Sequence, residues 1–247
     1  MEEVQGLTRS ARNVLAVATM SHMTQHLYMG MSVLYPSIMT SLQLSYPELG
    51  LAVSVGSILA GVLQLMMSIL SLYTPRRVIL GFGNLLYSMA EFGTALSRNF
   101  IQLFSANLLG GVGQAVQHPI GVSILSDKYR QSSVGGALGL FYGLAYVGNI
   151  IGPIILAALA TVLGWRSALY LFAVPPALIG IYIMTHLRGE WSAGKTSKQV
   201  SLHKDLSSCI RVKGAVAVIL SQSLLAAGTG MGALVIYTPL FLANQIH

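Results

Sequence analysis

Seven long apolar runs occupy most of this chain, and their length restricts the fold more than any other feature. They span residues 13–34, 47–72, 78–97, 99–125, 134–163, 166–187 and 212–242. A helix needs about 20 apolar residues to cross the roughly 30 Å hydrocarbon core of a bilayer. The runs are too long for buried strands and lack the alternation of a transmembrane barrel. The sequence therefore predicts an all-α integral membrane protein with about seven transmembrane helices.

Composition supports this class over a soluble one. Hydrophobic residues make up 54% of the chain and charged residues 9%, and the mean hydropathy is +0.69. A soluble domain carries about 25% charged residues. The alternative, buried helices of a soluble protein, would require a polar face on most of the runs, and none is found.

The positions of the basic residues predict how the helices are oriented. With a cytoplasmic N-terminus, twelve of the 14 Lys and Arg residues fall on inner segments, and only Arg98 and Arg166 fall on outer ones. This is the positive-inside pattern of a multi-pass protein in the cell (inner or plasma) membrane. The net charge of +7 is thereby accounted for by orientation. Because the basic residues are scattered over short loops, we expect no nucleic-acid partner.

Residues that could support enzyme chemistry or a metal site are scarce. Cys209 is the sole cysteine, and no local array of Cys or His accompanies it, so neither an internal disulfide nor a zinc site is expected. The GGVG at 110–113 lies within an apolar run and lacks the Gly-Lys-Ser/Thr end of a nucleotide-binding loop. We expect no cofactor and no enzymatic activity.

The spacing of the runs predicts three parts. The first six runs are joined by short connections and form a unit over residues 1–187. A polar, Lys-rich linker at 188–211 is expected on the cytoplasmic side, where it can lie on the anionic leaflet. Residues 212–247 hold the seventh run and form the third part.

Three motifs, in order, carry a family resemblance. The fourth run reads NLLGGVGQAVQHPIGVSILSDKYR (107–130), the fifth contains GNIIGP (148–153), and Trp165-Arg166 opens the sixth. These resemble the glycine-spaced fourth helix, the antiporter motif of the fifth helix and the Trp-Arg pair of the major facilitator superfamily. The resemblance implies a bundle of paired six-helix halves, of which this chain supplies the first and one further helix.

A closer branch is also suggested. Residues 21–64 and the pair His118-Pro119 are similar to drug exporters of the fosmidomycin-resistance type, which implies efflux by proton antiport. Arg76 and Arg77 match the gating loop of the superfamily, although Leu72 stands near its expected aspartate. Asn107 stands where many members have arginine, and His26 where such exporters often have an acidic residue. Proton coupling by the usual carboxylates of the family is therefore not assumed.

Polar residues inside the runs are the candidates for a transport pathway, because they are costly in a bilayer and tend to be functional. Thr19, His22 and His26 fall on one helical face. A second face of the fourth run combines glycine with three polar residues: Asn107, Gln114 and His118. Helices one and four line the cavity in the resembled fold. Histidine changes charge near neutral pH, so these histidines can carry a proton, donate to an anionic substrate, or simply join helices.

Glu91 is the carboxylate that lies well inside a run, on one face with Asn84 and Ser88. Burial favours its protonated form, which suits either a proton carrier or a structural hydrogen bond. Gln222 is a further amide expected in the pathway, within the seventh run.

Glycines spaced by four or five residues along the fifth run are expected to allow close approach of a neighbouring helix. They are Gly135, Gly139, Gly143, Gly148 and Gly152.

Two functions remain open at this point. The chain is a proton-coupled exporter of small organic molecules by alternating access, with the bilayer, substrate and protons as partners. Alternatively, it is a truncated fragment without transport of its own, which needs the missing second half or a second copy.

Overall fold

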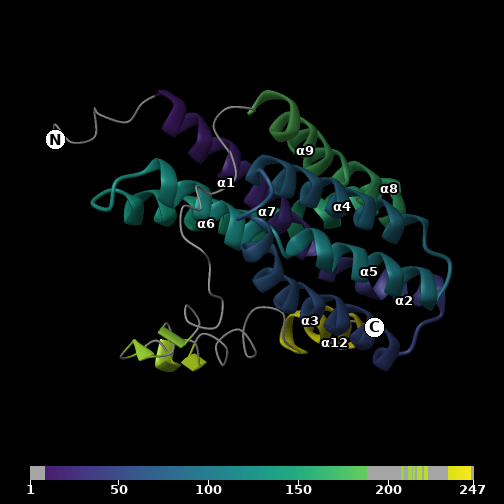
Figure 1. Ribbon diagram of the computed structural model, residues 1–247. Coiled ribbons are helices and arrows are strands. Elements are labelled where there is room, and N and C mark those ends of the chain that lie inside the picture. Colours follow the sequence, from purple (N-terminus) through teal and green to yellow (C-terminus); the bar gives the residue numbers. More distant parts are fainter. Residues whose placement is uncertain are drawn as a thin grey trace. The chain divides into compact units, whose positions relative to one another are not determined.

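The computed structural model describes residues 9–187, short stretches between 207 and 221 (207–208, 211–212, 214, 216–218 and 220–221), and residues 233–245. The chain divides into two compact units, Met1–Ala193 and Gly194–His247, which are considered separately. All regular secondary structure among the described residues is helical (Figure 1).

The described part of the first unit, residues 9–187, contains ten helical segments in the order of the six predicted runs. They are α1 (Arg9–Met29), the 3₁₀ helix η2 (Gly30–Leu34), α2 (Tyr35–Leu42), α3 (Tyr46–Leu70), α4 (Arg76–Leu96), α5 (Phe100–Gln114), α6 (Gln117–Lys128), α7 (Val134–Leu163), α8 (Trp165–Phe172) and α9 (Val174–His186). The described part of the second unit contains α12 (Ala233–Gln245), with Pro239 inside it. The first, fourth and sixth runs are thus each divided into shorter helices.

Proline and glycine account for these divisions. Pro119 near the start of α6 has no N–H for the carbonyl four residues before it, which favours the break between α5 and α6. Pro175 and Pro176 occupy the first turn of α9, where the missing N–H groups cost nothing. Gly30 begins the 3₁₀ segment, where its backbone lies against Gly152 and Pro153 of α7.

Among the described residues, three helical stretches are long and apolar enough to cross a membrane by length and composition: Tyr46–Leu70, Val134–Leu163 and Trp165–His186. The helices α1 and α4 instead hold most of the buried polar side chains of the described residues. The bundle therefore combines apolar outer helices with a polar interior, the expected all-α membrane architecture.

The short connections are closed by specific caps. Ser45 and Glu48 form a capping box at the start of α3, with Ser45 N donating to Glu48 Oε2 at 2.8 Å. At the same end of the bundle, Arg166 donates to Ser41 Oγ and to the Ser97 carbonyl oxygen, both at 2.9 Å. Arg166 thus ties the start of α8 to the ends of α2 and α4.

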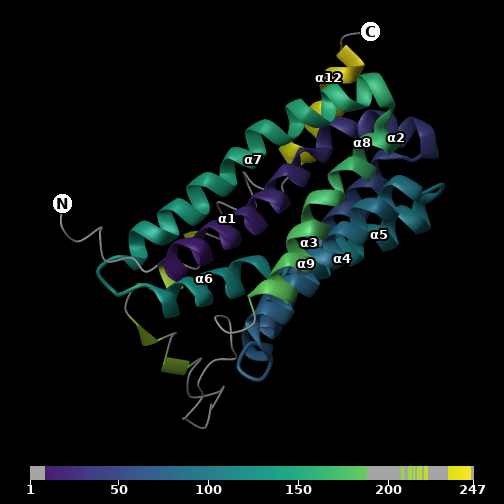
Figure 2. The ribbon, with the colours of Figure 1, turned by 90° about the horizontal axis from the view of Figure 1, so that it is seen from above.

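The most extensive contact between described helices of the unit joins α1 to α7, which run side by side (Figure 2). A Cβ atom on Gly148 would lie 2.9 Å from the Met23 carbonyl oxygen and from Leu27 N, and one on Gly152 would overlap the Leu27 backbone. These two glycines allow close approach as predicted.

The same prediction is wrong for Gly135, Gly139 and Gly143, where an added Cβ would have no neighbour within 4 Å. The five-residue step from Gly143 to Gly148 turns the helix face by about 140°, so the two groups of glycines point in different directions. Only the second group meets α1.

Candidate functional site

Three histidines from two helices lie together inside the first unit. The rings of His22 and His26, both on α1, have centroids 4.6 Å apart, and His118 on α6 lies 4.8 Å from His22. His22 is fully buried and His26 is 4% exposed, while His118 is half-buried. The two predicted polar faces, on the first and fourth runs, therefore meet at their histidines.

The hydrogen bonds within the histidine cluster have a defined order of donors and acceptors. His26 Nδ1 lies 2.8 Å from Asn149 Oδ1 on α7, and His26 Nε2 lies 3.1 Å from His22 Nε2. An amide oxygen only accepts, so His26 donates from Nδ1. A neutral His26 then has a free Nε2, which accepts the Nε2–H of His22. The result is a chain from His22 through His26 to Asn149.

Aromatic residues of α7 cover the cluster. Phe141 stacks on His22 with a centroid distance of 4.4 Å, Tyr142 lies 5.8 Å from His118, and Tyr146 lies 4.6 Å from His26. Residues 142, 146 and 149 are spaced by four and three, so they share one face of α7. These aromatic residues were not predicted to belong to the site, although this spacing was the available signal.

The other candidates of the fourth run do not join the histidines. Asn107 donates to the Leu103 carbonyl oxygen of its own helix at 3.0 Å, and its backbone packs against Gly56 of α3. Gln114, the last residue of α5, is half-buried. The break between α5 and α6 separates both residues from the helix that carries His118.

Thr19, predicted on the histidine face, lines a neighbouring groove of about 570 Å³ between α1 and α7. The groove is otherwise mostly apolar, with Met20 and Leu144 among its walls and Arg12 in its lining.

Glu91 occupies a different part of the interior. Its side chain is 1% exposed, and Oε2 has no hydrogen-bond partner. Tyr28 and Tyr87 are its ionisable neighbours, and their rings lie 5.0 Å apart. No hydrogen bond or ring contact found among the described residues joins Glu91 to a histidine. Gln222, the remaining pathway candidate, lies outside the described residues.

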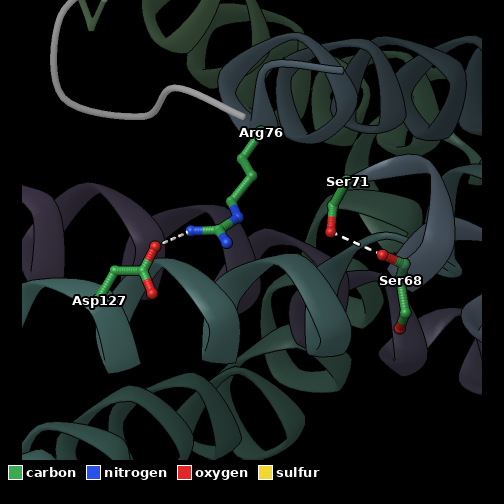
Figure 3. Close-up of polar contacts among 4 residues, drawn as sticks. All are labelled: Ser68, Ser71, Arg76 and Asp127. Carbon is green, nitrogen blue, oxygen red and sulfur yellow. Dashed lines mark hydrogen bonds and ion pairs between the residues drawn. The ribbon is translucent and has the colours of Figure 1, made fainter. Parts of the chain in front are cut away.

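The predicted gating arginines are both engaged. Arg76 at the start of α4 forms an ion pair with Asp127 near the end of α6 (Figure 3). Arg77 donates to the Met184 carbonyl oxygen in the last turn of α9 at 2.8 Å, where the negative end of the helix dipole favours a cation. The two arginines thus fasten α4 to α6 and to α9 at one end of the bundle.

Removing Asp127 is expected to destabilise the protein more than removing the whole ion pair. The Arg76 side chain is 10% exposed, so Asp127→Asn leaves a buried cation without its partner, at a cost of about 1 to 3 kcal/mol. The double variant Arg76→Gln with Asp127→Asn removes the cation as well and should recover part of that loss. Thermal unfolding of the purified protein in detergent measures both effects. Losses that simply add in the double variant would contradict the coupling.

Within the described parts of the chain, no group of three or more His, Cys, Asp or Glu side chains is arranged to hold a metal ion. The clustered histidines instead contact one another, Asn149 and aromatic rings of α7.

Solved structures show which class of fold this arrangement belongs to. A bacterial homologue of the human lysosomal transporter Spinster, in its inward-facing and unoccupied conformation, aligns with a TM-score of 0.75 at 20% identity, over 96% of this chain and 56% of that one. At this identity the likeness establishes the fold, a helical bundle of the kind found in membrane transporters.

The chain belongs to the Major Facilitator Superfamily, whose family model matches residues 15–247. A probable L-galactonate transporter of Escherichia coli strain K12 is 30% identical over 153 residues, which are 62% of this chain and 33% of that protein. Citrate exporter 1 of Aspergillus niger is 26% identical over 134 residues, 54% of this chain and 26% of the exporter. The match therefore covers about a third or less of the length of these relatives.

Proposed function

We propose that the chain forms the first half, and the beginning of the second, of a proton-coupled secondary transporter that exports small organic molecules by alternating access. In this proposal residues 1–187 are the six-helix half, 188–211 the cytoplasmic loop and 212–247 the seventh helix. The observation that carries the proposal is the buried chain from His22 through His26 to Asn149, beside His118. It supplies titratable groups where α1, α6 and α7 meet.

The hydrogen-bond order suggests how a proton would move. A proton accepted by His22 on Nδ1 allows the Nε2–H of the same ring to pass to His26 Nε2. His26 then carries the positive charge while still donating to Asn149. A change in the distance between α1 and α7 would break this chain and release the proton, so proton binding and helix movement are coupled.

Substrate class and direction rest on the relatives. Their names include a probable L-galactonate transporter, a riboflavin transporter, a citrate exporter and an antiporter. The first and the citrate exporter concern organic acids, and protonated histidines beside Asn149 would suit an anionic substrate. Export by antiport, in the manner of the fosmidomycin-resistance-type branch, and a place in the plasma membrane complete the proposal. Arg76 and Arg77 would then latch the inner end in one state.

Proteoliposomes that contain the protein and an internal pH-sensitive dye provide the test. Addition of L-galactonate, citrate or riboflavin is expected to cause a substrate-dependent change in internal pH. Substrate movement without a pH change would contradict proton coupling. No movement of any of the three would contradict transport by this chain alone, and would favour the fragment that works only with a second half or a second copy.

A further inference from the structure

A closed ring of hydrogen bonds lies one residue away from two of the histidines. Ser21 Oγ donates to Gln117 Oε1 at 3.0 Å, and Gln117 Nε2 donates to Asn84 Oδ1 at 3.2 Å. Asn84 Nδ2 closes the ring by donating to Ser21 Oγ at 2.8 Å. The three residues come from α1, α6 and α4, and are 0%, 2% and 0% exposed in the order Ser21, Gln117, Asn84.

The side-chain oxygen and nitrogen atoms of all three ring residues take part in hydrogen bonds. The Ser21 hydroxyl donates once and accepts once, and both amides use their oxygen and their nitrogen. Asn84 Nδ2 also donates to the Leu80 carbonyl oxygen at 2.8 Å. A buried polar group without a partner costs about 1 to 3 kcal/mol, whereas a fully paired network rigidifies its surroundings. The ring therefore favours one particular placement of the three helices.

Close backbone packing holds α4 in position for this contact. Gly83, next to Asn84, faces Val116, next to Gln117, and an added Cβ on Gly83 would overlap the Val116 side chain. A Cβ on Gly113 would lie 2.7 Å from Tyr87 N. Helix α4 thus packs closely against the break between α5 and α6. Asn84 lies where its side chain reaches both α1 and α6.

Two residues of the hydrogen-bond ring lie next to clustered histidines in the sequence. Ser21 precedes His22 and Gln117 precedes His118, and the two histidine rings lie 4.8 Å apart. The ring therefore ties together the two backbone segments from which these histidines arise. Helix α4 itself contributes no histidine.

We propose that Asn84 is a positioning residue, which sets the separation of His22 and His118 by closing the ring with Ser21 and Gln117. This inference rests on the proposed function only for its importance to proton coupling. The geometric claim stands by itself, and it differs from a general packing role for Asn84. A packing role would affect stability without changing the distance between the two histidine positions.

The test measures that distance through a disulfide. Cysteines replace His22 and His118 in a Cys209→Ser background of the full chain, and the rate of oxidative cross-linking is followed in membranes. Disulfide formation depends steeply on the separation of the two residues, so Asn84→Leu is expected to slow it roughly five-fold or more. Ser88→Ala is the matched control, because Ser88 lies on the same helix and donates to the Ala173 carbonyl oxygen, away from the ring.

Two outcomes decide the proposal. Slower cross-linking in Asn84→Leu but not in Ser88→Ala supports it, whereas equal rates in both would overturn it, whatever their thermal stabilities. Ser21→Ala opens the same ring by loss of one hydroxyl and replaces Asn84→Leu if that variant does not fold. The assay follows neither a proton nor a substrate, so failure of proton coupling in proteoliposomes would leave this result unchanged.

Discussion

Replacing both His22 and His26 by alanine is expected to reduce transport driven by a pH gradient by on the order of 100-fold, the scale of a lost proton-transfer group. The double variant removes both members of the 3.1 Å Nε2 contact and leaves Asn149 Oδ1 without its donor. Exchange of substrate across the membrane without a gradient needs no net proton movement, so it should decline much less. Proteoliposome transport with and without an imposed pH gradient measures the two rates.

The control for this experiment is His186→Ala. His186 is exposed in the last turn of α9, where Nδ1 lies 2.7 Å from Thr185 Oγ1. It has the same chemistry as the clustered histidines but no contact with them, so gradient-driven transport should remain. Equal losses in both variants would indicate a general effect of histidine replacement.

Glu91 offers the competing explanation, and the same assay separates the two. Glu91→Gln keeps the shape of the side chain but cannot release a proton in the same range. Coupling that is lost in Glu91→Gln and retained in the double histidine variant would assign the proton to the tyrosine-lined part of the interior. The histidine proposal would then be wrong.

The pattern of apolar residues along the sequence predicted some helices correctly but missed breaks in others. The run at 134–163 coincides with α7, which continues through Pro153 although an interior proline removes one backbone hydrogen bond. The first run was expected to be one helix, but it breaks at Gly30–Leu34. At this break the Gly30 backbone lies against Gly152 and Pro153, more than 120 residues later in the sequence. A contact with such a distant partner has no local signal in the sequence.

The candidate site, like the helices, was predictable from the sequence only in part. Periodicity placed His22 and His26 on one face, and the likeness to known transporters brought helices one and four together, which agrees with the observed contact to His118. The partners that give the cluster its order were not predictable in this way. The contact of His26 with Asn149 spans 123 positions, and that of Ser21 with Gln117 spans 96. Each depends on the rotation of two packed helices.

Replacing Gly152 by valine is expected to destabilise the first unit more than any other glycine replacement on α7 apart from the neighbouring Gly148. A Cβ at this position would overlap the Leu27 carbonyl oxygen and lie 2.9 Å from the Leu27 Cα. Backbone atoms cannot move aside as a flexible side chain can, so overpacking of this kind costs about 1 to 3 kcal/mol or more. In a chain of this size, about 3 kcal/mol corresponds to a fall in Tm of about 6 to 12 °C.

Gly139→Val is the matched control, because it makes the same substitution on the same helix where an added Cβ meets nothing within 4 Å. Its Tm in detergent should stay within about 2 °C of the parent, as for other replacements away from packed features. A similar fall in both variants would mean that valine in α7 is harmful for reasons other than contact with α1. A fall confined to Gly152→Val would support close α1–α7 packing as the feature that holds Asn149 against His26, since Asn149 lies between Gly148 and Gly152.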